Sequence, residues 1–115
     1  IIKMSSSPAP SALLPESVKR DIVRNCEQFR VTIIHGETGC GKSTQVPQVL
    51  LDWCLGEARD TRQIICSQPR RLAAVAVAER VAAERGEELG ATVGFAIGQR
   101  AVVSPSTRLL FLTAG

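Results

Sequence analysis

The amino-acid sequence predicts an α/β domain in which a parallel β-sheet is flanked by helices. Short apolar runs typical of buried strands alternate with longer segments in which apolar residues recur every three or four positions. Strands connected through helices are expected to be parallel, because parallel neighbours need long crossover connections. With 115 residues, of which 44% are hydrophobic and 22% charged, the chain has the size and composition of one domain with a packed core.

The first half of the chain predicts a helix, a strand and a second helix. Residues 1–13 are rich in serine and proline, and we interpret them as a flexible lead-in. An apolar stripe predicts a helix from Pro15 to Phe29, and the β-branched run Val31 to Ile34 predicts a buried strand. The next helix is predicted from Lys42 to Leu55, with a local distortion at Pro47 because proline lacks the backbone donor. Its apolar face comprises Val46, Val49, Leu50, Trp53 and Cys54.

The second half predicts further strands around an alanine-rich helix. Gln63 to Ser67 and Val93 to Ile97 are short apolar runs typical of strands. Arg71 to Arg85 has high helix propensity, and its alanines imply close packing against neighbouring elements. Arg108 to Leu112 is predicted as a final buried strand, although a run this short is also compatible with a buried helix.

Composition excludes several classes of protein. No apolar run approaches the roughly 20 residues of a membrane-spanning helix, and Ile1 to Pro10 lacks the apolar stretch of a signal peptide. The four cysteines form no C-x-x-C pair, which argues against structural zinc and favours reduced, intracellular thiols. The net charge of +3 points weakly to an anionic partner. Because the chain begins with Ile1 rather than methionine, we expect a fragment of a longer protein.

A glycine-rich loop lies between the first predicted strand and its helix. Gly36 to Ser43 (GETGCGKS) matches the pattern G-x-x-x-x-G-K-[ST] in full. Glycines let the backbone curl so that amide donors point at phosphate oxygens, next to the positive end of the following helix. Lys42 is expected to reach the terminal phosphates, Ser43 to hold Mg²⁺, and Thr44 to contact another phosphate oxygen. The alternative is a glycine-rich turn with a surface lysine, but the flanking strand and helix favour a nucleotide.

Three other side chains near this loop are interpreted as structural. His35 has no candidate catalytic partner nearby, so we expect it to end a strand without a chemical role. Cys40 lies near Lys42 and a helix start, which could lower its thiol pKa, but its simpler role is to fill a small-residue position. Glu37 would repel the phosphates if it acted as a general base.

Motifs of one protein family occur along the chain in order and at the expected spacing. They are GETGCGKSTQVPQ (Gly36 to Gln48), SQPRRL (Ser67 to Leu72), AERVAAERG (Ala78 to Gly86), VGF (Val93 to Phe95) and LLFLTAG (Leu109 to Gly115). Together they resemble the DEAH/RHA family of superfamily 2 RNA helicases, over nearly the whole chain from Leu14 onward. The resemblance implies a RecA-like P-loop NTPase fold, with residues 14–115 as the N-terminal portion of the first RecA-like domain, incomplete at its C-terminus.

The resemblance also implies which residues bind ligands. The ligand is expected to be ATP or another nucleoside triphosphate, with Mg²⁺ on Ser43 and Lys42 as the catalytic side chain. The residues expected to bind the nucleotide are Gly36, Thr38, Gly39, Cys40, Gly41, Lys42, Ser43, Thr44 and Arg80. In this family the position of Arg80 stacks on the nucleotide base. Arg70 and Arg71 match a motif that grips the RNA backbone, and Thr113 matches a further RNA contact. By themselves, neighbouring arginines are more often a solvated basic pair.

Two departures from the family pattern limit what this chain is expected to do. Gly98 stands where many relatives carry arginine, and the chain stops at Gly115, before the acidic D-E-x-H motif that positions Mg²⁺ and the attacking water. We therefore expect the fragment alone to be inactive and the parent to be an ATP-dependent RNA helicase. With three Phe, one Trp and no Tyr, contacts to RNA are expected through phosphates rather than stacked bases.

The resemblance further implies a second RecA-like domain and C-terminal domains in the parent. From the apolar runs and the cysteines we expect no membrane association and a location inside the cell, nuclear or cytoplasmic. Two alternatives remain open. A small P-loop kinase would need an arginine-bearing lid and an acceptor site, whereas the residues after Leu72 are an alanine-rich helix and short strands. A non-enzymatic nucleotide- or RNA-binding module would keep the loop but lack the D-E-x-H motif in its full gene product.

Overall fold

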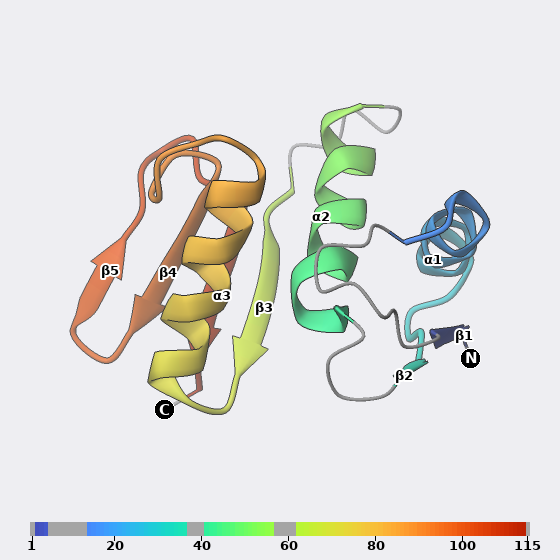
Figure 1. Ribbon diagram of the computed structural model, residues 1–115, viewed down its shortest axis with the longest axis horizontal. Coiled ribbons are helices and arrows are strands. Elements are labelled where there is room, and N and C mark those ends of the chain that lie inside the picture. The colour runs from blue at the N-terminus through green and yellow to red at the C-terminus, as the bar shows by residue number, and fades with distance from the viewer. Residues whose placement is uncertain (1, 5–13, 37–40, 57–61, 115) are drawn as a thin grey trace. The chain divides into compact units, whose positions relative to one another are not determined.

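The computed structural model describes residues 2–4, 14–36, 41–56 and 62–114. The chain divides into two compact units, Ile1–Trp53 and Cys54–Gly115. Each unit combines parallel strands with at least one helix (Figure 1), which confirms the predicted α/β class. Within the described ranges, no helix has the length and hydropathy that crossing a membrane requires.

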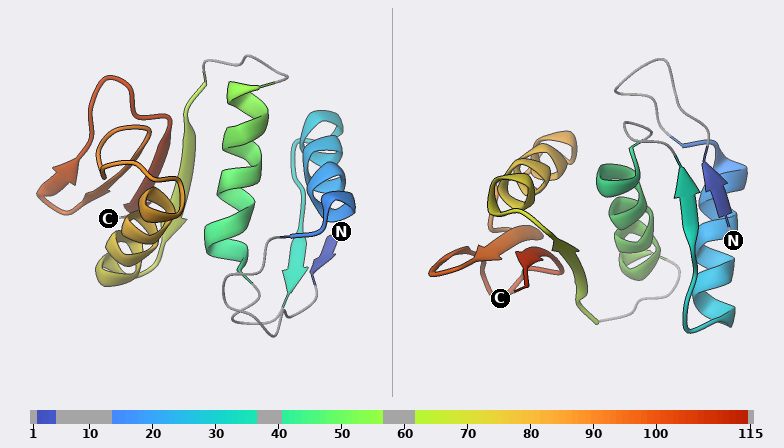
Figure 2. Two further views of the ribbon diagram at one scale, coloured as in Figure 1. Left: turned by 45° about the horizontal axis from the view of Figure 1, so that its top comes forward. Right: turned by 90° about the horizontal axis from the view of Figure 1, so that it is seen from below.

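The first unit is built from two short strands and two helices. Strand β1 (Ile2–Met4) pairs in parallel with β2 (Ile34–Gly36), and α1 (Glu16–Gln28) lies alongside both strands (Figure 2). Helix α2 (Lys42–Leu55) follows β2 and begins and ends where the sequence predicted. It continues unbroken through Pro47, although this residue has no N–H to offer the carbonyl of Ser43.

The core of the first unit joins the two helices to the strands. Ile22 of α1 is completely buried, and Ile2, Leu14 and Val49 are at most 9% exposed. Partly buried side chains packed around them are Val18, Val23, Cys26, Ile34, Val46 and Leu50. Most residues of the two predicted apolar stripes lie in this core, as expected for residues three and four positions apart, which share one helix face. Phe29 is the exception: it lies beyond the end of α1 and is 59% exposed.

The prediction of a buried strand from Val31 to Ile34 is wrong in extent and in burial. The strand begins only at Ile34, and the side chains of Val31 and Ile33 are 77% and 58% exposed. Its partner is also different, since β2 pairs with β1 and belongs to a separate sheet from the other strands. A β-branched run favours extended backbone, but burial depends on a neighbouring strand or helix that the run itself does not specify.

Strand β1 was not predicted from the sequence. Its residues, Ile2–Met4, fall inside the stretch 1–13 that the sequence suggested as a flexible lead-in, while residues 5–13 lie outside the described part of the chain. A strand this short leaves no periodic pattern to detect, and it is stabilised by pairing with β2 about 30 residues away. The boundary at residue 13 therefore stays a prediction.

The second unit is a four-stranded sheet with one helix on it. Its strands are β3 (Ile64–Gln68), β4 (Val93–Ile97), β5 (Arg100–Val102) and β6 (Leu109–Thr113), in the spatial order β3-β6-β4-β5. Strands β3, β6 and β4 are parallel, and β5 is antiparallel at one edge. Helix α3 (Arg71–Glu84) contacts all three parallel strands (Figure 1). The three predicted strands and the predicted helix are thus present, each within about one residue of its expected bounds.

The core of the second unit lies between α3 and the sheet. Residues with no exposed surface come from β4 (Val93, Phe95), from β6 (Leu109, Phe111) and from α3 (Ala74, Ala78, Val81). Small alanine side chains allow the backbone of α3 to pack closely on β4 and β6, as the composition of this helix predicted. The expectation of a buried strand holds less well for β3, because this strand lies at a sheet edge and its Ile65 is 58% exposed.

Strand β5 was not predicted. It forms a hairpin with β4 in which Ile97 pairs with Arg100, so that Gly98 and Gln99 make the two-residue turn. Gly98 has a φ of +50°, in the left-handed region that tight hairpins of this length require at their first turn residue. The glycine between two short apolar runs was the available signal for this hairpin.

Candidate nucleotide-binding and RNA-binding sites

The first candidate site is the junction between β2 and α2. Strand β2 ends at Gly36 and helix α2 begins at Lys42, while Glu37, Thr38, Gly39 and Cys40 lie outside the described residues. Gly41 has a φ of +88°, and its carbonyl accepts the first helical bonds from the N–H groups of Thr44 (3.2 Å) and Gln45 (2.7 Å). A Cβ atom at this position would lie 3.2 Å from Gln45 Cγ. Conformation and space therefore both favour glycine where the loop enters the helix.

Lys42 links the two ends of the loop. Its ammonium group donates a hydrogen bond to the carbonyl oxygen of Gly36, so the side chain reaches back from the start of α2 to the end of β2. Ser43 is exposed, whereas the Thr44 hydroxyl donates to the Gly41 carbonyl at 3.3 Å. The structure thus brings together Gly36, Gly41, Lys42, Ser43 and Thr44 from the predicted set.

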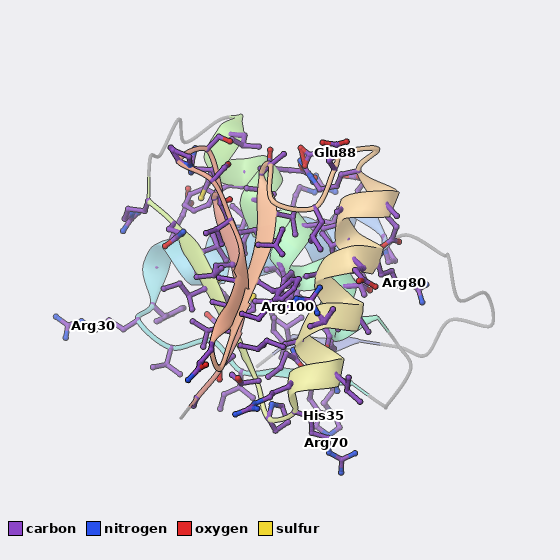
Figure 3. The ribbon with its side chains drawn as sticks, turned by 90° about the vertical axis from the view of Figure 1, so that its left-hand side faces the viewer. Arg30, His35, Arg70, Arg80, Glu88 and Arg100 are labelled. Carbon is purple, nitrogen blue, oxygen red and sulfur yellow. The ribbon has the colours of Figure 1, made fainter. Side chains whose placement is uncertain are left out.

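The second candidate site lies at the carboxyl edge of the four-stranded sheet. Strand β3 leads through Pro69 into α3, for which Arg70 is the N-cap residue and Arg71 the first helical residue. Arg70 has extended backbone, and its carbonyl accepts the N–H of Ala74 at 3.0 Å. Both arginine side chains are exposed, and Arg70 projects away from the ribbon at the start of the helix (Figure 3).

Strand pairing places Thr113 at the same edge. In the parallel register between β3 and β6, Thr113 pairs with Gln68, two residues before Arg70. Because β4 is parallel to β6, with Ala96 opposite Leu112, the turn that follows β4 also lies at this edge. The carboxyl ends of parallel strands are the usual place for ligands in α/β sheets. The structure therefore gathers the three predicted RNA-binding residues in one region.

The β4–β5 turn brings two further residues to this edge: Gly98, which the sequence marked only as a departure from the family pattern, and Arg100, which the sequence reasoning missed. A Cβ atom at Gly98 would lie 3.3 Å from Cζ of Arg71, so the arginine head group rests beside this turn. Arg100 follows the turn, and its Cζ lies 5.2 Å from the centroid of the buried Phe95 ring, a cation–π contact. Neither contact leaves a local pattern in the sequence, because each depends on how the hairpin and α3 meet the sheet.

Arg80 lies on α3 in the second unit, whereas the glycine-rich loop belongs to the first. Its Nε is 3.9 Å from Oε2 of Glu84, a pairing along the same helix face. This ion pair describes how the Arg80 side chain lies along α3 and does not test whether it stacks on a nucleotide base. The stacking role of Arg80 remains a prediction.

Other reactive side chains in residues 14–36, 41–56 and 62–114 do not gather into a site. Burial raises the pKa of the Cys66 thiol to about 11, so this cysteine is protonated and inert at neutral pH. His35 is exposed, but it is the middle residue of β2, where it pairs with Lys3, and not the end of a strand as the sequence suggested. In the part of the chain that the structure describes, no three His, Cys, Asp or Glu side chains gather in a way that could hold a metal ion.

Comparison with known proteins identifies relatives of this chain. No protein-family model matches the chain. The helicase named DExH3 of Arabidopsis thaliana is 51% identical over 104 residues, which cover 89% of this chain and 9% of that protein. The mouse (Mus musculus) protein DHX57 is 49% identical over 105 residues, 90% of this chain and 8% of its own length. This chain belongs to the DEAH/RHA family of RNA helicases.

A third member, the ATP-dependent RNA helicase DExH1 of Arabidopsis thaliana, is 44% identical over 99 residues, 85% of this chain and 10% of that protein. The chain therefore spans about a tenth or less of the length of these DEAH/RHA relatives. The two α/β units are consistent with part of a RecA-like helicase domain. Membership confirms the resemblance on which the expected ligands were based, while the individual site residues remain predictions.

Proposed function

We propose that this chain is the N-terminal portion of the first RecA-like domain of an ATP-dependent RNA helicase. The observation that carries the proposal is the β2–α2 junction, where Gly41 turns the backbone and Lys42 reaches back to the Gly36 carbonyl. Identity of 44% to 51% with proteins named as ATP-dependent RNA helicases supports the same reading. In the parent, we place this portion beside a second RecA-like domain and C-terminal domains, in the nucleus or cytoplasm.

The junction fits a nucleoside triphosphate with Mg²⁺. The Lys42 ammonium donates to the neutral carbonyl of Gly36, and a charged phosphate oxygen is a stronger acceptor for it. We infer that Lys42 exchanges the Gly36 carbonyl for the terminal phosphates when nucleotide binds. Ser43 is exposed in the first turn of α2, at the point where a metal ligand is needed. Bound Mg²⁺ would neutralise charge on the phosphates.

Thr38, Gly39 and Cys40 complete the proposed loop through their backbone amides, and Arg80 is proposed to face the base. The residues that would orient the attacking water are absent from this sequence, which contains no D-E-x-H segment. We therefore expect nucleotide binding without turnover by the chain alone. Cys26 and Cys66 are free thiols, which is consistent with the proposed location inside the cell.

The carboxyl edge of the second unit is proposed to hold the RNA backbone. Arg70 and Arg71 carry two exposed guanidinium groups, and the first amides of α3 lie beside them. Thr113 adds a hydroxyl from the paired strand. The two phenylalanines of this unit, Phe95 and Phe111, are fully buried, so the unit offers no ring for base stacking. Binding is therefore expected to ignore base sequence.

Titration calorimetry with ATP and Mg²⁺ tests the nucleotide site in the full-length protein. Lys42→Ala is expected to lose most of the affinity, since it removes a charge-assisted contact of about 1.5–3 kcal/mol. Lys19→Ala is the matched control, because it removes the same charge from α1, where Lys19 forms a 3.4 Å ion pair with the exposed Glu16. Equal affinity for the Lys42 variant and the control would exclude the assignment.

The RNA site is tested by the salt dependence of binding to single-stranded RNA. Each neutralised phosphate contributes about −0.7 to the slope of log K against log salt, so Arg70→Ala/Arg71→Ala should flatten it by roughly 1.4. Arg20→Ala/Arg24→Ala removes the same charge from exposed positions on α1. If both double variants flattened the slope equally, a diffuse basic surface would replace the proposed site.

A further inference from the structure

The guanidinium group of Arg71 lies against the β4–β5 turn at Gly98. A Cβ atom at position 98 would be 3.3 Å from Arg71 Cζ, 3.4 Å from Nη2 and 3.6 Å from Nη1. All three distances are at or below ordinary contact, so the whole planar head group faces the place where a side chain would begin. The space beside Gly98 is filled by the end of Arg71.

This contact restrains an otherwise exposed side chain. Arg71 is the first residue of α3 and is exposed overall, and an arginine with nothing against its end samples many rotamers. Contact with the backbone of a two-residue turn limits that sampling. Restricting a binding group before its ligand arrives lowers the entropic cost of binding.

The β4–β5 turn also lies at the sheet edge where RNA is proposed to bind. Gly98 follows β4, whose carboxyl end lies at the same sheet edge as Thr113 and the start of α3. We propose that Gly98 is a positioning residue: its missing side chain lets the β4–β5 turn hold the Arg71 guanidinium in place for one RNA phosphate. The proposal rests on the proposed RNA-binding function of Arg71 and assigns Gly98 a role through that residue alone.

The backbone strain and the steric clash that a substitution at position 98 introduces can be measured separately. Gly98 has a φ of +50°, so any side chain there is strained whatever surrounds it. Gly86, at the opposite end of α3, has a φ of +68° but nothing within 4 Å of its would-be Cβ. Substitution at Gly86 therefore introduces the same kind of backbone strain without a clash, which makes it the matched control.

The experiment measures binding of the full-length protein to single-stranded RNA across a salt series. Gly98→Asn is compared with Gly86→Asn, because asparagine tolerates positive φ better than most residues. Arg71→Ala should flatten the salt slope by about 0.7, one phosphate contact. Gly98→Asn should flatten it by a smaller amount and weaken binding about three- to tenfold, since the guanidinium is displaced rather than removed. Gly86→Asn should bind like the wild type.

A double variant tests whether Gly98 acts through Arg71. Gly98→Asn/Arg71→Ala is expected to bind RNA no more weakly than Arg71→Ala, because the group that Gly98 positions has already been removed. Gly98→Ala, which intrudes by one methyl group, is expected to lie between wild type and Gly98→Asn. This smaller change keeps the test usable if Gly98→Asn lowers the stability of the protein.

The outcomes separate this inference from the proposed function. Positioning by Gly98 is excluded if both Gly98 variants bind like Gly86→Asn while Arg71→Ala still flattens the slope. It is also excluded if the double variant binds more weakly than Arg71→Ala, because Gly98 would then act through another group. If Arg71→Ala leaves the slope unchanged, the RNA contact of Arg71 itself fails.

Discussion

The hydroxyl group of Thr107 anchors the start of β6, the strand on which both parallel neighbours depend. Thr107 is 7% exposed, and its Oγ1 accepts the N–H of Ser104 at 3.0 Å, while its O–H is shared between the carbonyls of Ala91 at 2.8 Å and Gly90 at 3.3 Å. These bonds tie the turn before β6 to the loop that precedes β4. Thr107→Val keeps the shape of the side chain and removes all three bonds.

The structure sets the size of the expected effect. A buried polar group left without a partner costs about 1–3 kcal/mol. Ser104 and Ala91 are only partly buried, so water can satisfy part of what the hydroxyl provided. We expect Thr107→Val to lower the free energy of unfolding by about 2 kcal/mol, which corresponds to a Tm lower by roughly 8 °C in a chain of this length.

Urea-induced unfolding, followed by far-ultraviolet circular dichroism, measures this change. Thr107→Ser keeps the hydroxyl and removes the methyl group that lies over Gly94, so it should cost only about 1 kcal/mol. Ser106→Ala, in the exposed part of the same turn, should change stability by less than about 0.5 kcal/mol. The reasoning is refuted if Thr107→Val unfolds at the wild-type urea concentration, or if Thr107→Ser is the more destabilised of the two.

Two further predictions follow from backbone conformation and burial. Gly41→Ala forces an L-residue to a φ of +88° and brings its Cβ to 3.2 Å from Gln45 Cγ. ATP affinity, measured by calorimetry, should therefore fall about tenfold, the equivalent of ~1.4 kcal/mol of strain. Unchanged affinity would contradict this geometry. The Cys66 thiol, with its pKa raised by burial to about 11, keeps its proton in the folded state when the unfolded thiol ionises near pH 9. Its contribution to stability is therefore complete below pH 9 and is lost as pH rises toward 11; unfolding of wild type and Cys66→Ala, compared between pH 8 and 11, should diverge in this window, and parallel curves would be inconsistent with the burial of the thiol.

The sequence by itself determined the features whose causes are local. Helix α2 begins and ends where its apolar periodicity and the pattern around Gly41 and Lys42 predicted. Helix α3 and the runs that became β4 and β6 were found within about one residue, because alanine propensity and short apolar runs are properties of neighbouring positions. The family motifs were recognisable for the same reason, since each is a contiguous string of residues.

Tertiary structure alone decided which segments pair and which side chains meet. Val31 and Ile33 have the composition of a buried strand and are exposed, while the unremarked Ile2–Met4 forms a strand with residues far along the chain. The contact between Gly98 and Arg71 joins a hairpin turn to a helix start, although the two residues are 27 positions apart. Strand pairing and side-chain contact gain their free energy from partners that are distant in the sequence. No local pattern records those partners, and only the folded chain brings them together.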